Sequence, residues 1–169
     1  MKRIEKRIAS IIMALVLVLF MALMLLPDIG VRVHADVGDF IPESDYLTFT
    51  AEQDGSSVTM NIENGSLRYR KGNDAWQDYR AGTAITLNNG ESVRFRGNNV
   101  TFDYDNHVNI TGKVACSGNI MSLRLDAEGK DQGLSNECFY CMFYGCTGLT
   151  TAPALPATTL AYGCYSSMF

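Results

Sequence analysis

From Tyr46 to about Gly118, short runs of alternating apolar and polar residues are separated by turn-forming Gly, Asn and Asp. Such alternation is typical of strands with one buried face, and helical periodicity is almost missing here. Asp54-Gly55 indicates a hairpin, because glycine tolerates the positive φ of tight turns. We therefore predict a small antiparallel β-sandwich at residues 46–118. The expected strands are Tyr46–Ala51, Ser57–Ile62, Leu67–Arg70, Ala75–Tyr79, Ala84–Leu87, Ser92–Arg96, Val100–Tyr104 and Val108–Thr111.

The tail, residues 119–169, repeats itself with a period of 26 residues. The run 138–143 (CFYCMF) recurs as 164–169 (CYSSMF). The same offset relates Leu123 to Leu149 and Leu134 to Leu160, which suggests a more diverged copy beginning near Gly118. A period of 26 lies within the range of about 20–29 residues that is typical of leucine-rich repeats.

Each repeat unit is predicted to contain a short strand and a helix. Pro153 and Pro156 hold residues 149–155 extended, and Thr158 or Thr159 can cap a following helix. Apolar residues then recur at spacing four, which places them on one helical face. They are Leu134, Cys138 and Met142 in one unit and Leu160, Cys164 and Met168 in the next. Because such a face is buried only by a neighbouring unit, we expect the units to stack into a solenoid.

The first 35 residues have the layout of a secretory signal peptide. Four cations between Lys2 and Arg7 precede an apolar run at 11–26, and Val33-His34-Ala35 supplies a small-residue cleavage site. An uncleaved membrane anchor is the alternative, although the run is short of the roughly 20 residues that span a bilayer. We expect a secreted or cell-surface protein with a signal peptide at 1–35 and a linker at 36–45.

The charge of the chain limits its partners. The whole chain has 14 Lys+Arg and 18 Asp+Glu, and its formal net charge is −4. After residue 35, 9 basic residues face 16 acidic ones. This excess argues against nucleic acid or anionic lipid as partner, and leaves an uncleaved signal segment as the only expected membrane contact.

Three groups of residues in the sandwich suggest binding. Trp76 and Tyr79 are candidate ligand-binding residues that can stack on a sugar, with core packing as the alternative. Asp103, Asp105 and Asn106 resemble a fragment of a calcium loop without the remaining ligands. The third group is four arginines on the outward side of their strands, which suit either a small anion-binding patch or a solvated face that discourages edge pairing. They are Arg68, Arg70, Arg94 and Arg96.

The sequence contains no recognisable set of catalytic residues. Cys138, Cys141 and Cys146 invite a metal or dithiol interpretation, but a zinc site needs a fourth ligand. A disulfide fits an exported chain better, although five cysteines leave one unpaired. With His107 as the only histidine after residue 35, no nucleophile, base and orienting group can be assigned. We expect no catalytic, cofactor-binding or metal-binding residues, and therefore no enzyme.

The run 142–160 (MFYGCTGLTTAPALPATTL) resembles the repeat unit of BspA-like leucine-rich repeat surface proteins of gut and oral bacteria. Segments 84–97 and 118–123 resemble the β-sandwich that precedes the repeats in such proteins. The resemblance covers roughly residues 46–169. It implies a surface or secreted protein that binds host or microbial macromolecules, protein or glycan, and it brings no shared catalytic residues.

The predicted fold class is mainly β with α/β repeats, a small antiparallel β-sandwich followed by the start of a leucine-rich repeat solenoid. The expected function is adhesion or protein or glycan binding through the repeat array. The alternatives are a carbohydrate-binding sandwich and an exported enzyme whose catalytic region lies beyond Phe169. Fewer than two full units are present, and about three are needed for a stable array, so we expect a piece of a longer protein.

Overall fold

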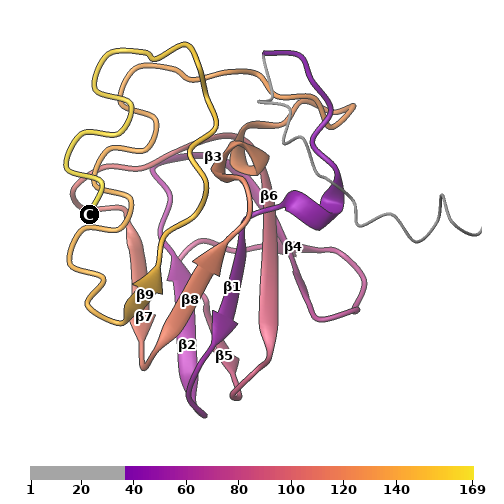
Figure 1. Cartoon of the computed structure of the whole chain (residues 1–169), viewed down its shortest axis with the longest axis vertical. Helices are drawn as coiled ribbons and strands as arrows, with labels where there is room; N and C mark the ends of the chain where they lie inside the picture. Colours follow the sequence, from indigo (N-terminus) through magenta and orange to yellow (C-terminus); the bar gives the residue numbers. More distant parts are fainter. Residues whose placement is uncertain (1–36) are drawn as a thin grey trace, which may run out of the picture. The chain divides into compact units, whose positions relative to one another are not determined.

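The computed structural model describes residues 37–169, which form two β-sheets and a coiled tail (Figure 1). The predicted signal peptide at 1–35 lies outside the described residues. Within residues 37–169, no helix is long and apolar enough to cross a membrane. The elements are 3₁₀ helices η1 (Glu43–Asp45) and η2 (Ile120–Arg124) and strands β1 (Thr48–Ala51), β2 (Ser56–Met60), β3 (Asn64–Lys71), β4 (Gln77–Tyr79), β5 (Ala84–Leu87), β6 (Ser92–Thr101), β7 (Val108–Thr111), β8 (Val114–Ser117) and β9 (Leu149–Thr151).

The larger sheet has the strand order β4-β3-β6-β1-β8-β9, and the smaller sheet has the order β5-β2-β7. All neighbouring strands are antiparallel except β8 and β9, which are parallel. The prediction of a mainly β region with two sheets is confirmed. Two of the expected strands, at 92–96 and 100–104, are replaced by the single strand β6, and β8 was not predicted.

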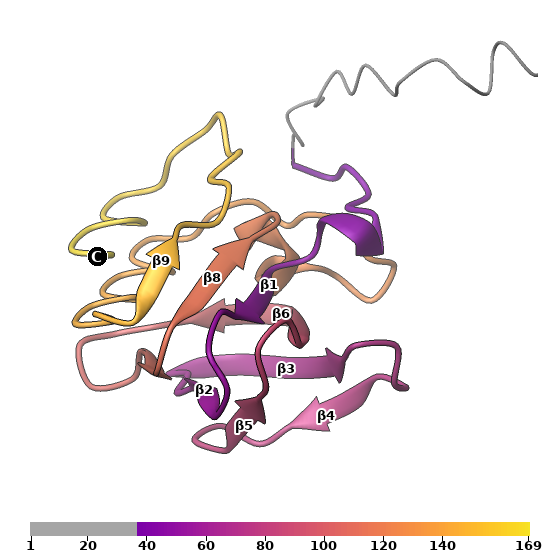
Figure 2. The ribbon, with the colours of Figure 1, turned by 60° about the horizontal axis from the view of Figure 1, so that its bottom comes forward.

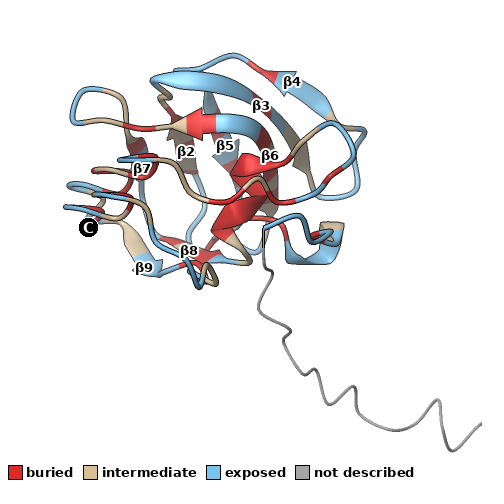
Figure 3. Ribbon diagram, turned by 90° about the horizontal axis from the view of Figure 1, so that it is seen from above, coloured by how far each residue is buried: buried red, intermediate tan, exposed pale blue. Residues whose placement is uncertain are grey.

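The two sheets enclose one apolar core, because apolar side chains alternate along their strands. Phe49 on β1 and Phe95 on β6 are fully buried and their rings meet edge to face, with centroids 5.9 Å apart. Val58 and Met60 on β2 are buried as well, and all four belong to the same cluster (Figure 3). Burial of each such side chain contributes about 1.5–3 kcal/mol.

A buried serine links η2 to the larger sheet. The Ser122 hydroxyl accepts a hydrogen bond from the backbone N–H of Leu47 at 2.9 Å and donates one to the carbonyl of Phe95 at 3.2 Å. The Asn119 side chain accepts from the backbone N–H of Met121 and so caps η2. Because no water reaches this site, Ser122 is the group that satisfies the Leu47 N–H.

The tail contains consecutive turns instead of the predicted α-helices. Backbone N–H groups bond to carbonyls three residues earlier, as from Tyr140 to Glu137 and from Tyr144 to Cys141. Glu137 and Cys141 have φ of 55° and 54°, which a right-handed helix cannot contain. The spacing-four apolar pattern is therefore produced by a coil with a left-handed residue at every fourth position. Cys138 and Met142 are buried as expected.

The 26-residue repeat is visible in this backbone geometry. Gly163 and Ser167 have φ of 61° and 51°, and they occupy the positions that Glu137 and Cys141 occupy one repeat earlier. We name the two turn segments the inner coil (residues 135–146) and the outer coil (residues 161–169). Figure 2 shows the part of the tail that follows β9, with its loops stacked beside the sheet.

Backbone hydrogen bonds and aromatic rings join the coils in register. Phe139 stacks on Tyr165 with centroids 5.9 Å apart, and Phe143 stacks on Phe169 at 5.5 Å. Both pairs have the 26-residue offset. Four N–H donors of the inner coil bond to carbonyls of the outer coil: Glu137 to Tyr162, Phe139 to Cys164, Cys141 to Ser166 and Phe143 to Met168.

The earlier copy predicted near Gly118 is not formed. Leu123 lies in η2 and is buried, whereas its proposed equivalent Leu149 begins β9 and pairs with Val114. The physical reason is that residues 120–124 fold against β6, where Leu125 N–H bonds to the Gly97 carbonyl. The 26-residue offset between Leu123 and Leu149 therefore has no counterpart in the structure.

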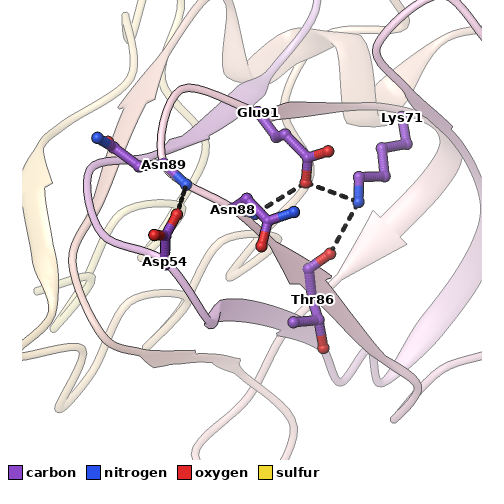
Figure 4. A network of polar contacts seen from close by, with 6 residues as sticks. All are labelled: Asp54, Lys71, Thr86, Asn88, Asn89 and Glu91. Carbon is purple, nitrogen blue, oxygen red and sulfur yellow. Dashed lines mark hydrogen bonds and ion pairs between the residues drawn. The ribbon is translucent and has the colours of Figure 1, made fainter.

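A polar network links the two sheets at one end of the sandwich (Figure 4). Lys71 on β3 forms an ion pair with Glu91 at 2.8 Å and donates to the carbonyl of Thr86 on β5 at 3.1 Å. Glu91 also accepts from the backbone N–H of Asn88 at 2.8 Å. These contacts hold the pKa of Glu91 below its ordinary value, first through the Asn88 hydrogen bond and then through Lys71.

We expect Ser122→Ala to destabilise the fold by about 1–3 kcal/mol, because it leaves the buried Leu47 N–H without a partner. Urea unfolding followed by the fluorescence of Trp76, the single tryptophan, measures the change. Ser117→Ala is the matched control. Ser117 is an exposed residue of β8, so this substitution should change the free energy of unfolding little. Equal stability of the two variants would contradict the role of the Ser122 hydroxyl.

We expect Glu91→Gln to reduce the loss of stability in acid. The Glu91 pKa is lower in the folded than in the unfolded chain, so its contribution exists above the ordinary carboxylate pKa and disappears as the pH falls through the folded value. Urea midpoints at pH 7 and pH 3 should differ less in Glu91→Gln than in the unchanged chain. Glu52→Gln at an exposed site is the control, and the same reduction there would refute the assignment.

Candidate functional site

The structure separates the two predicted ligand-binding residues, Trp76 and Tyr79. Tyr79 is only 8% exposed, and its hydroxyl accepts from the Met60 N–H and donates to the Thr83 carbonyl. Burial raises the pKa of this phenol. Its ring packs edge to face against Phe95, with centroids 5.5 Å apart. Tyr79 thus presents almost no ring surface to a ligand.

Trp76 is half-buried on the other side of the same sheet. The Arg70 guanidinium carbon lies 5.5 Å from its ring centroid, and Tyr46 approaches edge-on at 5.9 Å. The indole N–H donates to Glu43 at 3.3 Å. With Arg70 over one ring face, Trp76 and Tyr79 do not form a shared stacking platform.

The four arginines predicted to point outward lie together on the outer face of the larger sheet. Arg68 on β3 is directly opposite Arg96 on β6, and Arg70 is opposite Arg94. We name these four residues the arginine face. Arg68 is exposed, Arg94 and Arg96 are partly exposed, and the Arg70 side chain is only 19% exposed. Figure 3 shows the exposed stretches of neighbouring β3 and β4.

Two carboxylates face these four cations. Glu43 from η1 pairs with Arg70 at 2.6 Å, and Asp78 from β4 pairs with Arg68 at 3.1 Å. The Asp78 side chain is 94% exposed, so this second pair contributes little to stability. Among residues 37–169, neither Arg94 nor Arg96 forms an ion pair.

An exposed aromatic cluster lies where the sandwich meets the inner coil. Tyr104, in the loop between β6 and β7, is 57% exposed, and Tyr144 of the inner coil is 44% exposed. Their ring centroids are 5.3 Å apart. His107 packs edge-on against Tyr144 at 6.5 Å, and its Nδ1 lies 2.9 Å from the Tyr104 carbonyl oxygen. We name Tyr104, His107 and Tyr144 the aromatic patch.

The patch combines flat apolar rings with polar groups. The neighbouring Tyr144 side chain, through its charge when ionised and through a hydrogen bond, raises the pKa of Tyr104, so the Tyr104 phenol stays neutral at physiological pH. Neutral phenols donate and accept hydrogen bonds at the ring edge. Rings of this kind bind sugars or apolar side chains of a partner protein.

Sequence reasoning missed the aromatic patch because its two tyrosines come from distant segments. Tyr104 and Tyr144 become neighbours only when the inner coil pairs with the end of β6, through a bond from the Phe102 N–H to the Cys138 carbonyl. The one local signal is the polar loop at 103–107, whose carboxylates resemble a fragment of a calcium loop.

The suspected calcium fragment has a structural role in this loop. The Asp103 carboxylate accepts from the backbone N–H groups of Asp105 and Asn106 and from the Asn106 side-chain amide. These bonds shape the turn that presents Tyr104. Among the described residues, no three His, Cys, Asp or Glu side chains gather into a metal-binding group.

All five cysteines are free thiols in the structure. Burial raises the pKa of the Cys116 and Cys138 thiols, and raises that of Cys146 to about 11. The Cys146 thiol donates to the Val108 carbonyl at 2.9 Å. Such thiols are poor nucleophiles, because the reactive thiolate is almost unpopulated at neutral pH.

A shallow depression lies between Val37, η2 and the segment at 157–159, and its volume is about 270 Å³. Asp131 at its base is buried, and desolvation raises its pKa. The carboxylate accepts from the Gly133 N–H at 2.7 Å, while Arg124 donates to the Gly133 carbonyl. Asp131 and Arg124 therefore fix a loop from within.

Comparisons of the chain with protein-family models, with curated proteins and with solved structures found no match.

We expect Cys116 and Cys138 to resist alkylation by iodoacetamide at pH 8 in the folded protein and to react in urea, because burial raises their thiol pKa and blocks access. Mass spectrometry of the modified peptides measures the extent. Rapid modification of both thiols before unfolding would refute the described packing.

Proposed function

We propose that this chain is part of an exported surface protein that binds macromolecules, protein or glycan, through the face where the sandwich meets a leucine-rich repeat-like array. The aromatic patch is the observation that carries this proposal. It joins Tyr104 of the sandwich with Tyr144 of the inner coil, so a ligand there contacts both parts. Export rests on the signal-like sequence at residues 1–35.

The stacked coils support the repeat-array part of the proposal. The 26-residue offset recurs in backbone conformation, in hydrogen bonds and in stacked rings, as in the Phe139–Tyr165 pair. Repeat arrays use such stacking to extend a continuous surface on which a large ligand makes many contacts.

The aromatic patch supports binding over a purely structural role. Tyr104 and Tyr144 keep about half of their surface exposed while their rings are held at 5.3 Å, so their geometry is fixed before a ligand arrives. Fixed aromatic rings lose little conformational entropy on binding, and they are frequent among the residues that dominate binding energy.

We expect the double variant Tyr104→Ala/Tyr144→Ala to bind at least about tenfold more weakly than the unchanged chain to a glycan array or to immobilised mucin, because it removes both stacking surfaces. Binding is measured by fluorescence on the array and by biolayer interferometry on mucin.

Tyr162→Ala is the matched control, since Tyr162 is an exposed tyrosine outside the aromatic patch. Thermal unfolding must show that the double variant remains folded. Binding that is unaffected by the double variant, or equally reduced by Tyr162→Ala, would count against the patch as the binding site.

A further inference from the structure

We propose that the arginine face, together with the hydroxyl groups beside it, is a second binding site whose ligand is an acidic polysaccharide. This site lies on the outer face of the larger sheet and does not depend on the function proposed above. It is built from β3, β6, β1 and β8, which are neighbours in the sheet.

The register of the sheet places a row of polar side chains across four strands. Arg70 faces Arg94, Arg94 faces Thr48, and Thr48 faces Ser117. Neighbouring strands are about 4.8 Å apart, so the row spans about 14 Å. A second row, two residues along the strands, begins with Arg68 and Arg96. Guanidinium groups thus lie beside hydroxyl groups on one face of the sheet.

The arginines carry a local cost that a ligand would remove. Like charges directly opposite each other destabilise a sheet, and here this occurs twice, at Arg68–Arg96 and at Arg70–Arg94. The Nε atom of Arg70 is buried without a hydrogen-bond partner. An anionic group that accepts from the accessible N–H groups of these arginines would reduce the repulsion between them.

Protection of a sheet edge does not explain the cluster. Charged residues often stand on edge strands to discourage pairing with another chain. In this sheet β3 lies between β4 and β6, and β6 lies between β3 and β1. The arginines therefore stand on interior strands, and Arg68 and Arg94 have strand partners on both sides.

The surroundings of the arginine face favour an acidic glycan over other polyanions. Acidic residues outnumber basic ones after residue 35, so an extended, densely charged nucleic acid or membrane would meet repulsion elsewhere. A polysaccharide is thin, and its anionic groups alternate with neutral hydroxyls. Arginine forks match sulfate or carboxylate groups. The Ser117 hydroxyl can donate to and accept from sugar hydroxyls, and the Thr48 hydroxyl, which donates to the Tyr46 carbonyl, can accept from them.

Biolayer interferometry of the full chain tests this site with three probes: dextran sulfate, uncharged dextran and polyphosphate. We expect binding to dextran sulfate, no binding to dextran, and weaker binding to polyphosphate. Arg94→Gln/Arg96→Gln should weaken dextran sulfate binding by about tenfold or more, because each guanidinium makes charge-assisted hydrogen bonds. Lys113→Gln/Lys130→Gln, a matched loss of two exposed cations, should change it less than twofold.

Two further variants separate binding from folding. Arg94→Lys/Arg96→Lys keeps the charge but loses the planar fork, so it should give an intermediate loss even if the glutamine variant fails to fold. Glu43→Gln removes the carboxylate paired with Arg70 and should strengthen binding. Unaltered binding in both arginine variants, or equal loss in the lysine-site control, would overturn the site. Polyphosphate binding as tight as dextran sulfate binding would overturn the glycan assignment.

Discussion

The arrangement of residues 37–169 depends on a backbone hydrogen-bond ladder that begins in the sandwich and continues through the tail. Three N–H groups of the sandwich bond to carbonyls of the tail: Phe102 to Cys138, Val108 to Met142 and Val114 to Gly148. The Ile120 N–H at the start of η2 continues the ladder to the Ala154 carbonyl. The inner coil then donates in the same way to the outer coil. Without the tail these donors would lie unpaired at the side of a buried core, which is costly. The sandwich therefore acts as the first layer of the stack.

Aromatic side chains follow this ladder, and they explain why the layers share one register. Phe102 packs on Phe139, which stacks on Tyr165, and the shift of a layer by one residue would separate these rings. Left-handed backbone at Glu137 and Cys141 costs about 1–2 kcal/mol per residue. Burial of the neighbouring apolar side chains and the ladder bonds offset that cost. The aromatic patch exists because the same register brings Tyr144 to Tyr104.

The limits of prediction from the sequence follow from the range of each interaction. Alternation is local, so most strands and the outward direction of the arginines were predicted correctly. Apolar residues at every fourth position occur both in a helix and in a coil that has a left-handed residue at every fourth position. In the inner coil, Glu137 and Cys141 give no local sign of left-handed backbone because they are not glycines, whereas Gly163 in the outer coil is such a sign. Trp76 and Tyr79 are three positions apart, which places them on opposite faces of an extended strand. Contacts between β3 and β6, or between Tyr104 and Tyr144, depend on the tertiary fold.

The two proposed sites are connected by a single rigid element. Arg94 and Arg96 lie near the start of β6, and Tyr104 follows three residues after its end. At about 3.3 Å per residue, the eight positions from Arg96 to Tyr104 set an upper limit of about 26 Å on the separation of their Cα atoms, because the chain turns at residues 103–106. β6 is paired with β3 along most of its length and with β1 at its start, and the Phe102 N–H that follows it bonds to the Cys138 carbonyl, so this separation varies less than it would across a flexible linker. A long ligand bound at one site would be held close to the other site, which raises its effective concentration there. Its overall affinity would therefore exceed that of either contact alone. The sheet would then contribute to binding as a spacer of fixed length, in addition to its role as the support of the coils.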